Sequence, residues 1–295
     1  MFATLLGACP PDPAATSADE AVRDAIAEQE RAGLEPVTDG RGALAAGPDA
    51  VAAWKLASGS AGRAVKQALV GPMTEARATG EDPSSAADRL RETIDALVDA
   101  GCPLVEIDEP EVVRLGDEPA AMSAFVESHR RLTAALDGSI HLSLTVTGGN
   151  APESAAGAIF DLPYASYAFD LIAGPDNWRL IALAPSDRGI ICGALDPSAA
   201  ADDRPEILIW AAHYAASTGG RGLARVGLAN ASALDRLTPE RARAKVHALG
   251  EAARLAAVES PDELAAALDP RAVDIRSAAL GRFSPSAPAT RRPRR

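Results

Sequence analysis

Two adjacent carboxylates, Asp108 and Glu109, follow an apolar run of strand length and precede Pro110. Upstream, residues 89–100 have the apolar spacing of an amphipathic helix, and Gly101 marks its end. Acidic residues at the carboxyl end of a buried strand indicate a ligand site, because in parallel α/β folds these ends form the rim of the cleft. Side chains alternate along a strand, so we expect Asp108 to face the site and Glu109 to hold the turn. A solvated acidic turn is the alternative interpretation.

Short apolar runs alternate with Ala-rich amphipathic stretches along the chain, which indicates parallel strands joined by helices. Eight such units in about 250 residues predict a single closed (β/α)8 TIM barrel over residues 1–280, followed by a disordered Pro- and Arg-rich tail over residues 281–295. A doubly wound open sheet is the alternative, but no GxGxxG turn follows the first strand. The predicted strands are 4–7, 36–38, 65–70, 103–107, 140–146, 166–171, 189–194 and 222–228, and the predicted helices are 20–32, 85–100, 118–136, 151–160, 205–217, 239–257 and 260–268.

Polar residues and glycines are concentrated where these strands end. A purely structural barrel would not require that distribution, so we expect a small-molecule substrate at this rim. Asp108 is the predicted catalytic residue. The predicted substrate-binding residues are Gly7, Asp39, Arg41, Thr74, Asp108, Glu109 and Asp196.

The thiols and imidazoles are weaker candidates for chemistry. Cys9 lies in a predicted rim loop and is either a nucleophile or a residue without a role. Cys192 lies inside a predicted strand, where a small core residue is expected. His141 lies near the start of its strand and is predicted to be a core or bottom-layer residue. His129 and His213 fall in predicted helices, which places them on the outer ring.

The composition predicts an acidic globular protein. The 295 residues are 47% hydrophobic and carry a formal net charge of -12, and residues 281–295 contribute five arginines and no acid. The body of the chain is therefore more acidic than the whole, which argues against nucleic acid as the main partner. No apolar run reaches membrane-spanning length, and the three cysteines have no CxxC spacing. These features predict a soluble, cytoplasmic protein with no membrane partner.

Four motifs occur together in the order Thr4-Leu5-Leu6-Gly7-Ala8, Thr38-Asp39-Gly40, Leu69-Val70-Gly71-Pro72-Met73-Thr74 and Ile107-Asp108-Glu109-Pro110. In order and spacing the chain resembles the C-terminal catalytic barrel of the cobalamin-independent methionine synthase family, up to about residue 257. The resemblance implies a barrel of the methionine synthase and uroporphyrinogen decarboxylase type. It implies methyl or alkyl transfer to a small thiol or amino-acid-like acceptor, as in methionine biosynthesis, with Asp108 binding the acceptor's amino group. Methyltetrahydrofolate or another methyl donor, and a partner protein that supplies the methyl group, are further expectations.

The resemblance also implies a zinc ion, which the family holds with His, Cys, Glu and a second Cys to convert a thiol into a thiolate. The corresponding positions here read Ser143, Thr145, Asp170 and Ser232. Neutral hydroxyls are poor zinc ligands, so we predict a degenerate zinc site, no metal ligands and no assured cofactor. Arg41 stands where the family has a glutamate, which favours an anionic ligand or an internal ion pair over an ammonium group.

Three functions remain open from the sequence. The first is a methyltransferase of the methionine synthase type with an altered metal site. The second is a catalytically degenerate barrel that acts as a ligand-binding or partner subunit, which the substitutions at the metal positions favour. The third is a metal-free barrel like uroporphyrinogen decarboxylase, against which the shortage of rim arginines for a polycarboxylate counts.

Overall fold

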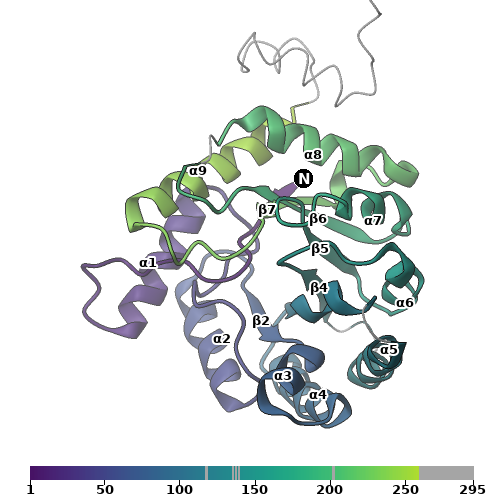
Figure 1. The fold of residues 1–295 in the computed structure, drawn as a ribbon. Coiled ribbons are helices and arrows are strands. Elements are labelled where there is room, and N and C mark those ends of the chain that lie inside the picture. The colour runs from purple at the N-terminus through teal and green to yellow at the C-terminus, as the bar shows by residue number, and fades with distance from the viewer. Residues whose placement is uncertain (117–118, 135, 137, 139, 201–202, 259–295) are drawn as a thin grey trace, which may run out of the picture.

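A curled sheet of seven parallel strands forms the centre of the molecule (Figure 1). The computed structural model describes residues 1–116, 119–134, 136, 138, 140–200 and 203–258. The strand order is β1-β7-β6-β5-β4-β3-β2, so chain neighbours are mostly sheet neighbours. The strands are β1 (Phe2–Ala3), β2 (Lys66–Val70), β3 (Leu104–Asp108), β4 (His141–Val146), β5 (Ser166–Asp170), β6 (Gly189–Leu195) and β7 (Val226–Asn230).

Helices surround the sheet on its outer face (Figure 1). Several begin at side-chain caps followed by a first-turn proline or an acid, which satisfies the free backbone N–H groups of the first turn. Ser17, Asp82 and Thr238 accept such bonds at the starts of α1, α4 and α9. The helices are α1 (Ala18–Arg31), α2 (Pro48–Ser60), α3 (Pro72–Thr79), α4 (Pro83–Asp99), α5 (Pro119–Thr133), α6 (Ala156–Phe160), α7 (Asn177–Leu183), α8 (Pro205–Ser217) and α9 (Pro239–Ala256), with 3-10 turns η1 (Pro110–Arg114), η2 (Glu153–Ala155), η3 (Thr218–Gly220) and η4 (Leu223–Arg225).

Two predicted strands at the N-terminal end are wrong in their extent. The first is Phe2–Ala3 rather than 4–7, because Leu6 N donates to the side chain of Asn230 at 3.0 Å instead of continuing a backbone ladder. The second, 36–38, is reduced to an isolated parallel bridge between Val37 and Val65. Pro36 has no N–H to offer a neighbouring strand, which shortens the pairing. The segment still contacts both sheet edges, since Glu35 N donates to Ala3 O and Val37 N to Ala64 O, each at 2.9 Å.

The other predicted elements need smaller corrections. The predicted strand 222–228 starts only at Val226, because Leu223–Arg225 form a 3-10 turn after Gly222 with its positive φ of 74°. The predicted helix 151–160 divides into η2 and α6. Three helices, α2, α3 and α7, have no counterpart among the predicted helices. The predicted helix 260–268 and the predicted tail 281–295 lie outside the described residues.

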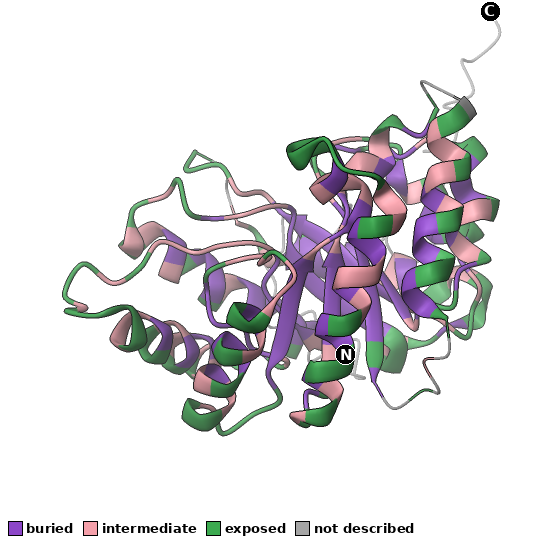
Figure 2. Cartoon of the chain, turned by 90° about the horizontal axis from the view of Figure 1, so that it is seen from below, coloured by how far each residue is buried: buried purple, intermediate pink, exposed green. Residues whose placement is uncertain are grey.

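The sheet separates two apolar regions. The larger core lies between its outer face and the helices, and the smaller cluster of Leu6, Ala168, Ile191 and Ala229 lies on the inner face. Figure 2 shows the strands buried and the helices exposed on their outward sides. The parallel α/β class is therefore confirmed, while eight strands and complete closure stay a prediction. Within the described residues, no helix combines the length and apolarity needed to span a bilayer.

Candidate functional site at the carboxyl ends of β3 and β4

The inner face of β4 carries two buried hydroxyl residues. Leu142, Leu144 and Val146 belong to the helix-side core, so the alternating residues Ser143 and Thr145 face the inside of the curled sheet. Each is only 1% exposed. Among the described residues, neither hydroxyl has a hydrogen-bond partner. Buried polar groups are usually paired, so this pair is an unusual feature of the molecule.

Asp108 ends β3 beside these hydroxyls. Its register partner on β4 is Thr145, and the partner of Glu106 is Ser143. Burial, and after it the negative charges of Glu106 and Glu109, raise the pKa of the Asp108 carboxyl from 3.8 to about 7. Thr147 Oγ1 lies 3.5 Å from Asp108 Oδ1 and counters that effect in part. Asp108 therefore changes its charge near neutral pH, which is the range that a general base needs.

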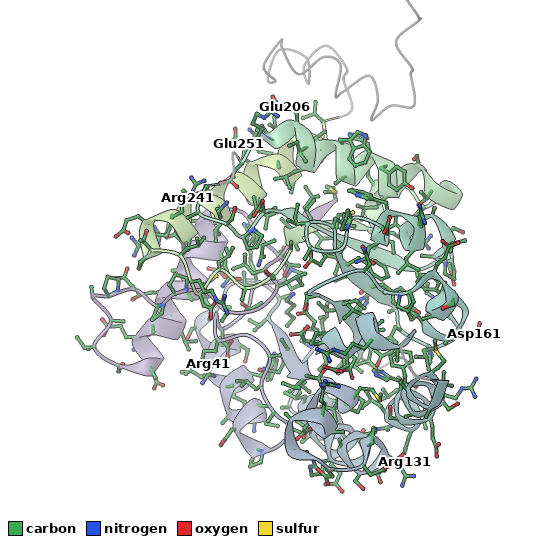
Figure 3. All side chains as sticks on the ribbon, viewed as in Figure 1. Arg41, Arg131, Asp161, Glu206, Arg241 and Glu251 are labelled. Carbon is green, nitrogen blue, oxygen red and sulfur yellow. The ribbon has the colours of Figure 1, made fainter. Side chains whose placement is uncertain are left out.

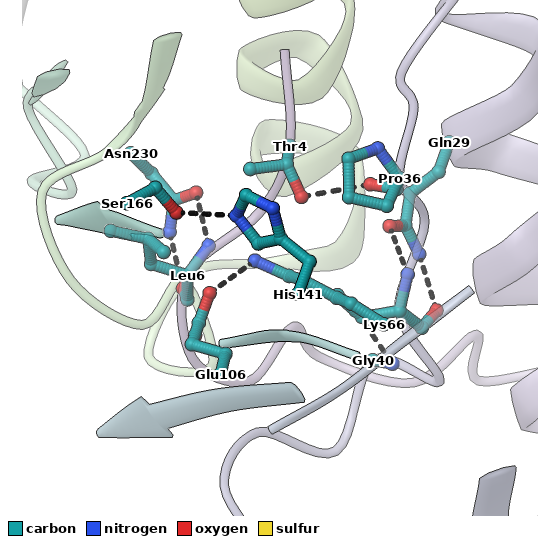
Figure 4. A network of polar contacts seen from close by, with 11 residues as sticks. Thr4, Leu6, Gln29, Pro36, Gly40, Lys66, Glu106, His141, Ser166 and Asn230 are labelled. Carbon is teal, nitrogen blue, oxygen red and sulfur yellow. Dashed lines mark hydrogen bonds and ion pairs between the residues drawn. The ribbon is translucent and has the colours of Figure 1, made fainter. Parts of the chain in front are cut away.

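A buried ion pair lies deeper on the same face. Lys66 Nζ of β2 donates to Glu106 Oε2 of β3 at 2.5 Å, and both side chains are at most 2% exposed (Figure 4). The pair neutralises Glu106 beneath the site, because each charge compensates the other in a region with little water. His141 Nε2 lies 2.8 Å from Ser166 Oγ at the start of β4, which keeps that histidine away from Asp108's end of the strand (Figure 4).

Glu109 has the opposite environment. It is fully buried and accepts hydrogen bonds from Met73 N and Thr74 N, each at 2.8 Å, and from the Thr74 hydroxyl. Its carboxylate therefore sits at the N-terminus of α3, where a negative charge is favourable. A Cβ at Gly71 would lie 2.3 Å from Glu109 Oε2, so only glycine admits this carboxylate. This is the turn-holding role expected for Glu109, and it occupies the Thr74 side chain as well.

His129 contacts Glu109 from the outer ring of helices. It lies on α5, as expected, but points inward and is fully buried. Its Nε2 lies 3.3 Å from Glu109 Oε2, and its Nδ1 lies 2.6 Å from the hydroxyl of Tyr164. A Tyr164 hydroxyl that donates to Nδ1 leaves the proton on Nε2, which then faces the carboxylate. The helical spacing of the buried residues Phe125, His129 and Leu132 was the signal that could have identified this position.

Arg41 and Asp39 form an ion pair of their own, with Arg41 Nε 2.8 Å from Asp39 Oδ2. Figure 3 shows Arg41 on the side of the molecule where α1 lies. There it lines a cavity of about 860 Å³ between the loop after β1, α1 and α9, together with Cys9. Asp108 does not line that cavity. The structure thus shows the internal ion pair that was one of the two expectations for Arg41.

Cys9 is unsuited to the role of nucleophile. Burial raises the pKa of its thiol from 9.0 to about 12, and the negative charge of Asp235 adds to the effect. The reactive form of cysteine is the thiolate, so this thiol is inert near neutral pH. Cys192 is fully buried, as predicted for a core residue.

The remaining predicted site residues have structural partners. Asp170 accepts from Ile172 N, Ala173 N and Gly148 N at 2.9, 2.8 and 3.1 Å, so its carboxylate closes a turn. Asp196 accepts from Ser198 N at 2.7 Å, and its carbonyl accepts from Lys245 Nζ at 2.8 Å.

The loops after β1 and β7 pack closely together. A Cβ at Gly7 would lie 2.9 Å from Ala233 Cα, and Gly7 has a positive φ of 71°. The carbonyl of Ser232 accepts from Asn230 Nδ2 at 2.7 Å. Gly7 and Ser232 therefore shape the rim around the strand ends.

The zinc site implied by the sequence does not fit these residues. Within the described part of the chain, no group of three or more His, Cys, Asp and Glu residues could hold a metal ion. Ser143 and Thr145 offer neutral oxygens, and Asp170 is held by three backbone N–H groups. Zinc prefers imidazole, thiolate and carboxylate ligands, so this donor set does not suit it.

Comparison with known proteins supports the fold. No protein-family model and no curated protein matches the sequence. A B12-independent methionine synthase from Shewanella, in complex with selenomethionine, is similar with a TM-score of 0.71 and 15% identity over 90% of this chain and 98% of its own. A methyltransferase from Methanosarcina mazei has a TM-score of 0.58 and 15% identity over 86% of this chain and 93% of its own. D-psicose 3-epimerase from Clostridium cellulolyticum, with D-tagatose, has a TM-score of 0.52 and 10% identity over 86% of this chain and 98% of its own.

At such low identity these similarities show the fold alone. Methionine synthase, a methyltransferase and a sugar epimerase all share it, so the fold is compatible with several chemistries. The chain is accordingly a parallel α/β protein with the fold of methionine synthase and methyltransferase barrels, and its function must be argued from Asp108 and its neighbours.

Proposed function

We propose that this protein transfers a methyl or other small alkyl group to a small thiol or amino-acid-like acceptor, without a zinc ion and with Asp108 as general base. The observation that carries the proposal is the Asp108 carboxyl, whose pKa of about 7 results from burial at the end of β3. An ordinary thiol has a pKa of roughly 8.5. A carboxylate with a pKa near 7 is close enough to accept its proton at neutral pH.

The proposed reaction has two changes of bonding. The S–H bond of the acceptor breaks, its proton moves to an Asp108 oxygen, and the electron pair stays on sulfur. The sulfur then forms a bond to the methyl carbon while the bond from that carbon to the donor breaks, and its electron pair stays on the donor atom. A methylated reduced folate or another N-methyl or sulfonium compound would be the donor. Base catalysis of this kind typically contributes 10²- to 10⁴-fold.

The alternative is a catalytically inactive barrel that binds a small ligand or serves as a partner subunit. Its support is the neutral donor set at Ser143 and Thr145, which lacks the ligands for a zinc-activated thiolate. The two functions differ in one result, because the inactive barrel would be stabilised by a ligand without converting it.

Turnover of purified protein tests the proposal. Alkyl transfer is assayed with a panel of thiols and methyl donors for the wild-type protein, Asp108→Asn and the control Glu111→Gln. We expect Asp108→Asn to lose at least about 100-fold in kcat/KM, and Glu111→Gln to keep its activity. We also expect kcat/KM of the wild-type protein to rise with pH and level off above about 7. Stabilisation by a ligand with no turnover would instead support the inactive barrel.

Metal analysis tests the absence of zinc separately. We expect less than about a tenth of an equivalent of zinc in the purified protein, and no binding on titration. A full equivalent bound, with activity lost on chelation, would contradict the metal-free reaction.

A further inference from the structure

The cavity of about 860 Å³ between α1, α9 and the loop after β1 has no part in the proposed reaction. Apolar side chains make up most of its lining, and its helical walls carry alanines such as Ala21 and Ala25 on α1 and Ala242 on α9. Side chains this small leave a hollow where two packed helices would otherwise interdigitate. The volume lies in the range of about 300–1,000 Å³ that is typical of ligand sites, so the cavity can admit a bound group or a segment of chain.

The charged part of the lining has an excess of carboxylates, with five carboxylates and three guanidinium groups. Each guanidinium group already pairs with a carboxylate of the lining: Arg31 with Glu28, Arg41 with Asp39 and Arg243 with Asp12. Among the described residues, Glu20 and Asp24 are left without an ion pair, although Glu20 Oε2 accepts hydrogen bonds from Thr16. These uncompensated charges favour a cationic occupant and disfavour an anionic one.

The chain itself supplies a cation of suitable shape. Residues 259–295 follow α9 and lie outside the described residues. Positions 284–290 hold only Ser, Pro, Ala and Thr, four of the five residues 291–295 are arginines, and no carboxylate side chain follows Asp274. Small and cyclic side chains suit walls lined by alanine, and guanidinium groups pair well with carboxylates. This segment therefore matches the cavity in both size and charge.

The length of the segment allows it to reach the cavity. Val258 is the last described residue, and it lies 11 positions beyond His247 and 15 beyond Arg243, which line the cavity from α9. At a rise of about 1.5 Å per helical residue, these separations are about 16–22 Å. A flexible chain as long as residues 259–290 has an average end-to-end distance of about 30 Å. A tethered group is most concentrated near its site when these two lengths are similar.

We propose that residues 284–295 bind in the cavity of their own chain, with the arginines of 291–295 against Asp24 and Glu20 and the preceding prolines and alanines between α1 and α9. This contact is independent of the proposed alkyl transfer. Because the segment is tethered, its effective concentration at the cavity is high, and individually weak ion pairs are sufficient to hold it. The contact depends on salt, since the Debye length falls from about 8 Å at 0.15 M to about 3 Å at 1 M ionic strength.

Disulfide trapping in the full-length chain tests the contact. The protein carries Ala289→Cys in the segment and Cys9→Ser, which removes the native thiol of the cavity. A second cysteine is placed either at Ala21, which lines the cavity, or at Ser123, an exposed residue of α5 on the side of the molecule away from α1 (Figure 1). We expect the disulfide with Ala21→Cys to form at least about tenfold faster than that with Ser123→Cys, and this preference to fall below about threefold in 1 M NaCl.

Charge variants test whether the arginines and the carboxylates are responsible. The combined Arg→Ser replacement at positions 291, 292, 294 and 295 should remove the preference for Ala21→Cys. Asp24→Asn should lower it about twofold to fivefold, as for a single exposed ion pair. The control Asp187→Asn removes an exposed carboxylate beside Arg188 and should leave the preference unchanged. Circular dichroism checks that each variant is folded.

Three outcomes would overturn the proposal. Equal disulfide rates with Ala21→Cys and Ser123→Cys would show that the segment does not favour the cavity, and would leave the cavity to another occupant. A preference that survives the arginine replacement would show that charge does not hold the segment there. Disulfide-linked dimers, formed at a rate that rises with protein concentration, would assign the cavity to the segment of a second copy of the chain.

Discussion

Asp108 and Glu109 are adjacent in the chain and differ in almost everything else. Glu109 is saturated with partners: two backbone N–H groups, one hydroxyl and one imidazole. Within the described part of the chain, the Asp108 carboxylate has one weak contact, with Thr147, and lies beside two unpaired hydroxyls. We conclude that a fully buried carboxylate with all its hydrogen bonds filled, such as Glu109, holds the fold together, whereas the half-buried Asp108, with open hydrogen-bond positions, can bind and react.

We expect the largest effect from removing the Glu109 carboxylate. Glu109→Ala leaves the donors at the N-terminus of α3 and the buried His129 without their partner, and we expect it to lower the free energy of unfolding by about 3–5 kcal/mol. Urea unfolding followed by circular dichroism measures this. The control is Glu111→Ala, whose carboxylate pairs with the exposed Arg77 and Arg114. It should cost less than about 1 kcal/mol. Equal effects of the two variants would remove the contrast on which the comparison depends.

The next effect concerns Asp108, whose carboxylate has unfilled hydrogen-bond positions. The pKa of Asp108 is raised in the folded protein, so folding favours its protonated form, and ionisation lowers stability as pH rises from about 4 to about 7. Asp108→Asn should abolish this loss. Its advantage over the wild-type protein should grow across that range to about 2–4 kcal/mol and stay constant above it. Urea unfolding of both proteins at a series of pH values measures this difference in stability. A difference that does not change with pH would show that burial does not raise the pKa of Asp108.

The sequence predicted the contrast between these two residues, because strand alternation sends successive side chains to opposite faces. It did not predict which partners would meet Glu109, since Thr74 and Met73 lie some 35 positions away in the chain. α3 has a proline in its first turn and Gly80 after its last residue, so its ends could have been recognised in the sequence. The short first strand depended on the side chain of Asn230, at the other end of the chain. Whether Ser143 and Thr145 find hydrogen-bond partners depends on β3 and β5, which flank β4 in the sheet. Local sequence patterns cannot reveal this.

Two histidines on helices give a smaller contrast. His129 bridges Glu109 and Tyr164, whereas His213 Nε2 on α8 is buried without a partner among the described residues. His129→Leu should therefore cost about 1–3 kcal/mol, and His213→Leu should cost less than about 0.5 kcal/mol or stabilise the protein. Thermal unfolding of both variants measures this. A larger loss for His213→Leu would contradict the assignment of His129 to the saturated network.

Cys9 should show the smallest effect. Because burial raises its thiol pKa to about 12, iodoacetamide at pH 7.5 should leave Cys9 unmodified in the folded protein while all three cysteines react after denaturation. Cys9→Ser should keep full alkyl transfer activity. Mass spectrometry and the activity assay provide the two measurements, and rapid labelling of Cys9 with loss of activity would restore it as a nucleophile.

The central claim is that Asp108 changes its charge near neutral pH at the open end of β3. Carbon-13 NMR of protein labelled at the aspartate carboxyl groups, with Asp108→Asn to assign the signal, measures this titration directly. We expect a midpoint near pH 7 for Asp108. A midpoint near the ordinary aspartate value of about 3.9 would contradict it, because the carboxylate would then be a fully charged and weak base at the pH where it is proposed to act.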